Sequence, residues 1–134
     1  MNYFEFTQKR KEQYNSFPMF CSFNETHFTE WMARVGAKDK SEILHIGFSM
    51  FVHKDKQKDF IDMRDGLEKE LEDALKDTYF FRSAIRYELN NREYCITNDA
   101  TEAIQSLWLS FEDFTDEQKE ILKQEKKRAI ELAF

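Results

Sequence analysis

The sequence predicts an α+β domain in which about seven helical segments pack around a small sheet of three short strands. The 134 residues include 14 Phe, 5 Tyr and 2 Trp but only 3 Gly and 1 Pro, so aromatic-rich elements are joined by few residues that break them. Helix-capping patterns recur along the chain, and between them lie short runs with the period of two that a strand requires. The length suits a single domain, residues 1–134.

Four helix starts are predicted from the capping box, in which a side-chain acceptor caps the helix and an acidic or amide residue three positions later reaches back. The pairs are Asn2 with Glu5, Asp39 with Glu42, Asp99 with Glu102, and Thr115 with Gln118. The first helix is expected to run from about Asn2 to Tyr14. It ends before Pro18, and the alternation over residues 19–23 predicts the first strand.

The next helix has the clearest apolar stripe in the chain. Asn24 or Thr26 is expected to cap it, and Gly36 stands where a helix commonly ends in a left-handed residue. Four apolar residues at positions i, i+3, i+4 and i+7 form the stripe: Phe28, Trp31, Met32 and Val35. We expect this face, and Trp31 in particular, to contribute to the core.

A short helical turn over residues 39–45 is expected to stop at Gly47. The run 48–53 is rich in aromatic and β-branched residues on both faces, which predicts a second strand in the centre of the sheet. Asp55 opens the longest predicted helix, whose apolar residues repeat every three or four positions to Leu75. Gly66 within it costs about 1 kcal/mol relative to Ala, which indicates a close helix crossing or a bend.

Residues 85–96 admit two interpretations. Alternating apolar residues around Asn90 and Asn91 would suit a two-residue hairpin, because Asn tolerates positive φ. We favour a helix that begins at Asp77 or Thr78 and continues to about Leu89, with one of the two asparagines as its left-handed cap. Residues 94–97 then form the third strand. A short helix with Ala100, Ala103, Ile104 and Leu107 follows, and the last helix starts at Thr115.

No catalytic motif and no cofactor-binding motif occurs in the chain. Three scattered glycines cannot build the loops that cradle phosphate groups, and we expect no cofactor. Cys21, His27 and Glu30 are the best candidates for a metal site, but their spacing is not that of a zinc site. We interpret His27 as a surface residue and expect no metal.

An enzyme built on a cysteine and a histidine is the alternative to a binding protein. Cys21 with His27, or Cys95 with His53, would supply a thiol and a base if the fold brought them together. His45 is the third histidine that such an enzyme could use in its active site. Without a disulfide framework, two reduced thiols are expected.

The charge balance disfavours direct binding to nucleic acid. Lys and Arg number 20 and Asp and Glu 26, giving a net charge of −6, whereas nucleic acids and anionic membranes attract clustered basic residues. The N-terminus lacks the features of a secretory signal, and no apolar run approaches the ~20 residues of a membrane span. We therefore expect a cytoplasmic protein that does not engage a membrane.

Aromatic residues at one helix junction provide the candidate binding site. Trp108, Phe111 and Phe114 are bulky groups between two predicted helices, and we expect a compact corner to bury some of them and to leave others exposed. Aromatic anchors of this kind dominate protein interfaces. Together with Glu112 and Asp113, they form the predicted partner-binding surface; the competing interpretation is that they seal the last helix onto the domain.

Two segments carry a family resemblance: NYFEF at residues 2–6 and YELNNREYCIT at residues 87–97. In these, and over most of its length, the chain resembles small acidic uncharacterised proteins of Gram-positive bacteria and of their prophages or mobile elements. The resemblance lends no active-site residues, because its motifs are not catalytic signatures. It implies a cytosolic accessory protein that binds a host or defence component.

These observations predict a non-enzymatic accessory protein that binds a protein partner. The expected partner is a host or defence component, and nucleoproteins are among the candidates. The expected effect is inhibition of a host nucleic-acid-handling or defence system, in the manner of an anti-CRISPR protein. Two alternatives stay open. One is the small Cys/His enzyme, and the other is a homo-oligomer, a homodimer with a structural role.

Overall fold

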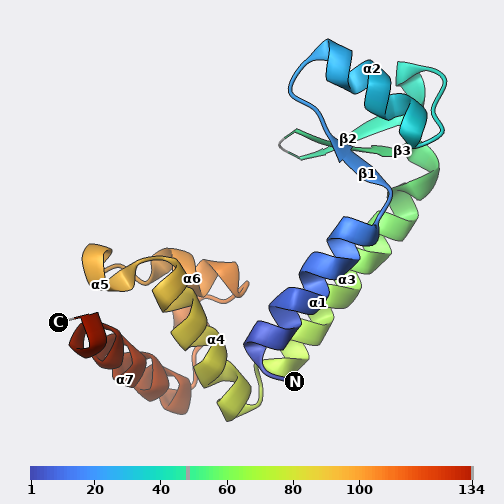
Figure 1. Ribbon diagram of the computed structural model, residues 1–134. Coiled ribbons are helices and arrows are strands. Elements are labelled where there is room, and N and C mark those ends of the chain that lie inside the picture. Colours follow the sequence, from blue (N-terminus) through green and yellow to red (C-terminus); the bar gives the residue numbers. More distant parts are fainter. Residues whose placement is uncertain (48, 134) are drawn as a thin grey trace. The chain divides into compact units, whose positions relative to one another are not determined.

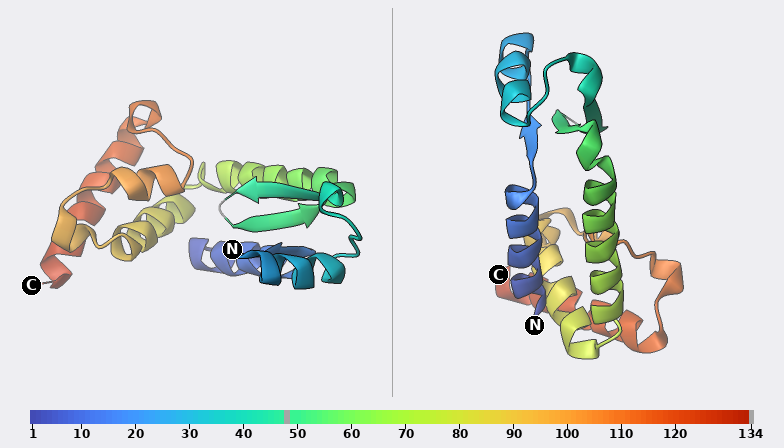
Figure 2. Two further views of the ribbon diagram at one scale, coloured as in Figure 1. Left: turned by 90° about the horizontal axis from the view of Figure 1, so that it is seen from above. Right: turned by 90° about the vertical axis from the view of Figure 1, so that its right-hand side faces the viewer.

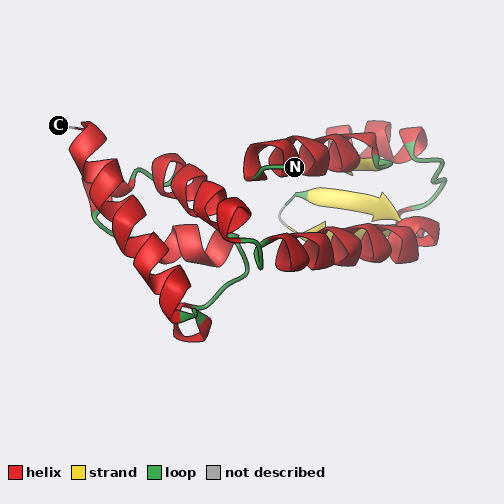
Figure 3. Ribbon diagram, turned by 90° about the horizontal axis from the view of Figure 1, so that it is seen from below, coloured by secondary structure: helices red, strands yellow, loops and turns green. Residues whose placement is uncertain are grey.

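Helices predominate in the computed structural model, which describes residues 1–47 and 49–133 (Figure 3). Within these residues the chain forms seven α-helices and three strands, which confirms the predicted α+β class. Two compact units are formed, Met1–Lys9 with Glu68–Phe134, and Arg10–Leu67. The boundaries fall within α1 (Tyr3–Ser16) and α3 (Gln57–Ala74). The assignment of residues 1–134 to a single domain stays a prediction.

The sheet belongs to the unit of residues 10–67 and is antiparallel throughout (Figure 1). Its strands in spatial order are β1 (Met19–Cys21), β3 (Met50–His53) and β2 (Ile43–Gly47). The central strand is β3, as predicted: Phe51 pairs with Phe20 on one side and with His45 on the other. Figure 2 shows β2 and β3 running side by side in opposite directions.

One of the three strands is not where the sequence predicted it. Asp39 caps only a single 3₁₀ turn, η1 (Lys40–Glu42), through a complete capping box, and the chain is extended from Ile43 onward. The predicted helical turn over 39–45 is therefore wrong in its second half, where β2 pairs with β3. Residues 94–97 are helical, so the predicted third strand there is also wrong. The predicted second strand began at Phe48, which lies outside the described residues.

Helix α2 (Glu25–Arg34) packs on β1 through aromatic contacts. The ring of Phe28 meets the rings of Phe20 and Phe51 edge to face, at centroid distances of 5.5 and 5.1 Å. Asn24, one of the two predicted caps, accepts a hydrogen bond from the backbone N–H of His27. These contacts hold the helix against one side of the sheet.

The apolar stripe of α2 is only half-buried, so it contributes less to the core than predicted. Trp31 stays partly exposed, and the guanidinium carbon of Arg34 lies 3.8 Å from its ring centroid. Gly36 follows the helix with φ of 81°, as predicted for a left-handed residue that ends a helix.

Helix α3 follows the 3₁₀ turn η2 (Lys54–Lys56) and confirms the predicted long helix. In the unit of residues 10–67, Phe60 of α3 contacts Tyr14 and Phe17 with ring centroids 6.2 and 5.6 Å apart. A methyl group built on Gly66 meets no atom within 4 Å. Of the two alternatives predicted for Gly66, the close helix crossing is therefore not seen among the described residues, and the bend stays a prediction.

The unit of residues 1–9 and 68–134 is organised around α4 (Thr78–Asn91). Helix α4 packs against three further helices: α5 (Tyr94–Thr97), α6 (Thr101–Ser106) and α7 (Asp116–Ala133). Asp77 caps α4 by accepting from the backbone N–H of Phe80 at 2.9 Å. As predicted, the buried face includes Phe81, Ala84, Ile85 and Leu89.

The start of α1 is tied to α4 by a buried polar contact. The hydroxyl of Tyr3 donates to the carboxylate of Glu88 at 2.5 Å, and both residues are buried. Arg92 lies one turn further along, with its Nε 3.5 Å from the second oxygen of Glu88. This network places the N-terminal residues beside the exposed face of α4.

Residues 85–96 contain helices, which confirms the helical interpretation over the hairpin. Helix α4 continues to Asn91, but the left-handed residue after it is Glu93, with φ of 54°, and not one of the asparagines. The predicted capping box of Asp99 with Glu102 is wrong: the N-cap residue of α6 is Ala100, and Asp99, one residue earlier, accepts from the N–H of Thr101. The capping box at the start of α7 is formed as predicted, with Thr115 and Gln118 exchanging hydrogen bonds of 2.9 and 3.1 Å.

Candidate functional site

The predicted binding site, residues 108–114, joins α6 to α7 and includes the 3₁₀ turn η3 (Phe111–Asp113). We call this segment the Trp108 corner. Trp108 and Phe111 are 48% and 46% exposed, whereas Phe114 is buried with its ring centroid 5.4 Å from that of Phe81. Phe114 therefore anchors the corner onto α4, and the other two rings form its solvent-facing aromatic surface.

The backbone of Trp108 adopts a conformation that is unusual for a large residue. Its φ is 56°, and it follows α6 in a Schellman motif: its N–H donates to Gln105 at 2.9 Å, and the N–H of Leu109 donates to Ile104 at 3.3 Å. Glycine usually occupies this position because a Cβ there costs roughly 1–2 kcal/mol. A strained residue whose side chain is half exposed suggests a role other than packing.

Carboxylates border the two exposed rings. Glu112 and Asp113 are exposed, and the first turn of α7 adds Asp116 and Glu117. The hydroxyl of Ser110 donates to the Glu112 carboxylate, and with a backbone hydrogen bond it holds the pKa of Glu112 below its ordinary value. Carboxylates therefore outnumber cations around the Trp108 corner at neutral pH, where the ammonium of Lys119, 5.5 Å from the centroid of the Phe111 ring, is the cation next to the aromatic surface.

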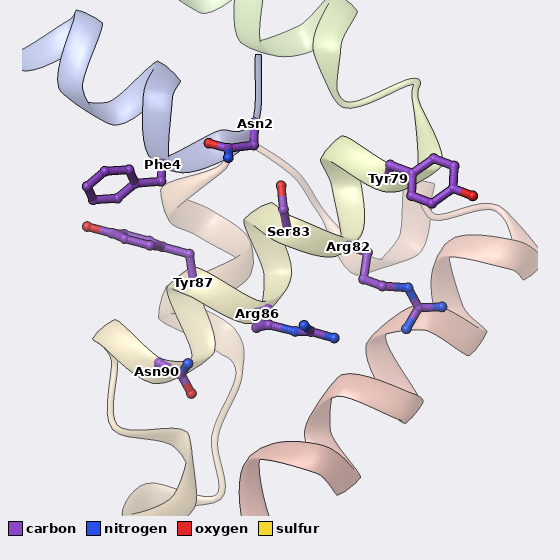
Figure 4. A pocket seen from close by; sticks show the side chains of 8 residues that line it. All are labelled: Asn2, Phe4, Tyr79, Arg82, Ser83, Arg86, Tyr87 and Asn90. Atoms are coloured by element: carbon purple, nitrogen blue, oxygen red, sulfur yellow. The ribbon is translucent and has the colours of Figure 1, made fainter. Parts of the chain in front are cut away.

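A second candidate site is a pocket of about 400 Å³ on the outer face of α4 (Figure 4). We call it the α4 pocket. Its residues from α4 recur at i, i+3, i+4, i+7, i+8 and i+11, which places them on one helix face away from the buried one. They are Tyr79, Arg82, Ser83, Arg86, Tyr87 and Asn90, with Asn2 and Phe4 from the start of the chain.

A buried carboxylate holds the two arginines of the α4 pocket. The side chain of Glu125, in α7, is 2% exposed; it accepts from Arg82 at 3.2 Å and from Arg86 at 3.1 and 2.6 Å. Burial alone would raise the pKa of Glu125, but the hydrogen bonds and charges of Arg86 and Arg82 outweigh it and lower this pKa. The hydrogen bond to Glu125 also raises the pKa of Arg86. Glu125 is therefore ionised and fixes both guanidinium groups.

The sequence contained a signal for the α4 pocket that the search for apolar stripes missed. The face of α4 opposite the predicted core carries two tyrosines and four polar residues, and two of the polar residues are arginines. Glu125 lies four residues after Ile121 and three after Leu122, both buried, so it occupies a core-facing position in α7. A carboxylate at such a position requires a cationic partner.

The cysteines and histidines lie outside both candidate sites. Cys21 is exposed in β1, and Cys95 is half-buried in α5, which belongs to the other unit. His53 has a local role, because its Nδ1 accepts from the N–H of Asp55 at 3.1 Å. Within residues 1–47 and 49–133, no three His, Cys, Asp or Glu side chains gather as metal ligands. In the same ranges no helix has the length and the apolar run needed to cross a bilayer.

Comparison with known proteins finds a family but no characterised relative. The model of a family described as "Family of unknown function (DUF7659)" matches residues 2–131. No curated protein and no solved structure matches the chain.

Proposed function

The chain belongs to the DUF7659 family, and we propose that it is a non-enzymatic accessory protein that binds a protein partner through the Trp108 corner. The observation that carries this proposal is the half-exposed Trp108 in a left-handed conformation. Packing within the chain leaves Trp108 and Phe111 each about half exposed to solvent. Both rings therefore have apolar surface to bury in a complex.

The Trp108 corner has the properties of an interface hot spot. Tryptophan is among the residues whose removal most weakens protein complexes, and hot spots are surrounded by residues that exclude water. The Schellman motif fixes the backbone of Trp108, and the buried Phe114 fixes the far end of the corner. A surface that is already ordered loses less conformational entropy on binding.

The partner proposed for this surface is a basic protein. Glu112 and Asp113 adjoin the exposed rings, and further carboxylates follow in α7. Complementary charge steers association and selects the partner. Proteins that handle nucleic acid present such basic surfaces, which supports the proposal that the chain inhibits a host nucleic-acid-handling or defence protein in the cytoplasm. The proposed origin in a phage or mobile element rests on the resemblance of residues 2–6 and 87–97.

Affinity capture from a host lysate tests the nature of the partner. The tagged chain should retain a stoichiometric basic protein after nuclease treatment, and raising the salt from about 0.1 to about 0.5 M should release it, because salt screens exposed charges. A chain carrying Glu112→Gln and Asp113→Asn should retain less of that protein. Recovery of no stoichiometric partner, or of one whose retention is independent of salt and of both carboxylates, would contradict the proposal.

A further inference from the structure

We propose that the α4 pocket binds a small anionic ligand with a planar ring, of the class of a nucleoside monophosphate. This site is separate from the Trp108 corner in its residues, and its function does not depend on the protein partner. The proposal rests on three features of the pocket: its two lining arginines, its aromatic rings, and the carboxylates that lie beside it.

The arginines form the end of the pocket that would hold the phosphate. A guanidinium group has five N–H donors, and the described hydrogen bonds engage two of Arg82, to Glu125 and Gln124, and two of Arg86, both to Glu125. Among the eight lining residues the charged side chains are the two arginines, and none is Asp or Glu. The carboxylates lie behind and beside them: Glu125 is buried under both guanidinium groups, and Glu117 and Glu120 line the neighbouring pocket with Arg82. The remaining N–H groups offer the forked geometry that binds phosphate bidentately.

Two of the three aromatic rings form the opposite end of the pocket. Figure 4 shows the rings of Phe4 and Tyr87 together on one side of the labelled group and both guanidinium groups on the other, where the ring of Tyr79 also lies. The two ring centroids are 6.4 Å apart with an interplanar angle of 52°, and Phe4 is 55% exposed. Exposed aromatic rings bind nucleobases by stacking. Asn90, exposed at the end of α4, supplies an amide for the edge of the base.

The neighbouring charges favour a single nucleotide over a nucleic-acid strand. Glu117 and Glu120 line the adjoining pocket together with Arg82, so the further phosphates of a strand would meet carboxylates. The volume of about 400 Å³ falls in the range of small-molecule sites, about 300–1,000 Å³. The pocket thus has one end for a phosphate group and one end for a planar ring, and its volume suits a single nucleotide.

Titration of the full-length ¹⁵N-labelled chain with adenosine 5′-monophosphate, followed by amide NMR shifts, tests the proposal. Adenosine monophosphate should shift amides within residues 79–90, and adenosine or inorganic phosphate alone should bind at least about tenfold more weakly, since each engages one end of the pocket. A five-nucleotide adenylate strand should bind no more tightly than the monophosphate. No shifts at millimolar monophosphate would overturn the proposal, and tighter binding of the strand would replace it with a strand-binding site.

Conservative variants locate the ligand within the pocket. Arg86→Lys keeps a cation beside Glu125 but loses the planar fork, and Phe4→Ala removes an exposed ring; each should weaken binding of the monophosphate about tenfold. Arg34→Lys and Phe23→Ala, in the unit of residues 10–67, are matched controls and should bind as the wild type does. Thermal unfolding confirms that each variant is folded. Wild-type affinity in both pocket variants would overturn the proposal.

Discussion

Trp108 occupies a backbone conformation that glycine adopts without steric cost, and this makes its strain measurable. Replacing Trp108 by Ala or by Gly removes the same ring, but only Ala keeps a Cβ in the left-handed region. We predict that Trp108→Gly is more stable to urea unfolding than Trp108→Ala by about 1 kcal/mol. The order reverses at an ordinary backbone position, because glycine loses more conformational entropy on folding than alanine does.

Phe111 provides the control for this comparison, because it is equally exposed and is not among the residues with positive φ. There, the Gly variant should be less stable than the Ala variant. Equal stabilities of the two Trp108 variants, or a more stable Ala variant, would show that Trp108 stores no backbone strain.

Gly66 and Gly36 respond in opposite directions to the same substitution. A Cβ at either position meets no atom within 4 Å, but only Gly36 has positive φ, 81°. Gly66→Ala should therefore raise the free energy of unfolding by about 1 kcal/mol, the difference in helix propensity. Gly36→Ala should lower it by about 1 kcal/mol, because Ala is strained in the left-handed region. Chemical denaturation of both variants checks the pair, and a destabilising Gly66→Ala would contradict this description of α3.

Residues that act locally could be predicted from the sequence, and residues whose partners are distant could not. Thr115 and Asn24 cap helices through groups three positions away: the spacing to Gln118 identified Thr115, and the cap of α2 was predicted as Asn24 or Thr26. Glu125 is paired with arginines about forty positions away, and no local pattern reveals that pairing. For Trp108 the helix junction and the bulky ring could be predicted from the sequence, but the left-handed backbone could not.

At the scale of elements, α4 and α7 are joined by the ion pairs of Glu125, and this contact should depend on pH. The pKa of Glu125 is lower in the folded than in the unfolded chain. Its contribution to stability is therefore complete above the ordinary glutamate pKa and is lost as the pH falls through the folded value. We predict that Glu125→Gln lowers the free energy of unfolding by about 2 kcal/mol at pH 7, and that this difference shrinks below about pH 4.

Glu131→Gln is the matched control in the same helix. Glu131 is exposed and pairs with Lys127 at 3.8 Å, so its substitution should change stability by less than about 0.5 kcal/mol at either pH. Urea unfolding of the wild type and both variants at pH 7 and pH 3.5 measures the effect. A Glu125→Gln difference that stayed constant over this range would contradict the assignment of an ionised, buried carboxylate.

The elements predicted correctly are those with long periodic patterns, such as α3 and α4. A strand was predicted for residues 94–97 because Tyr, Ile and Thr are common in strands. In the structure this segment is a helical turn that packs against α4 and α7, and the residues on either side of it, Glu93 and Asn98, are left-handed. Strand β2 was missed because its conformation depends on pairing with β3, and a run of five residues carries too little local signal to show it.

At the scale of the whole molecule, the proposed function places a small aromatic surface in a chain with a net charge of −6. The exposed rings supply the apolar contact, and the carboxylates beside them select a basic partner. The same rings could instead pair with a second copy of the chain, which is the homodimer interpretation. These two interpretations differ in whether the isolated chain associates with itself through Trp108.

The most direct test of the Trp108 corner measures the affinity of the captured partner for three chains: the wild type, Trp108→Gly and the control Phe23→Ala. Sedimentation of each chain without the partner measures whether the chain associates with itself. Phe23 is 81% exposed in the other unit. We predict that Trp108→Gly stays folded and binds the partner at least about tenfold more weakly, that Phe23→Ala binds normally, and that all three chains sediment as monomers. Unchanged binding by Trp108→Gly, or a wild-type dimer that this substitution dissociates, would contradict the claim that the Trp108 corner is the partner-binding surface.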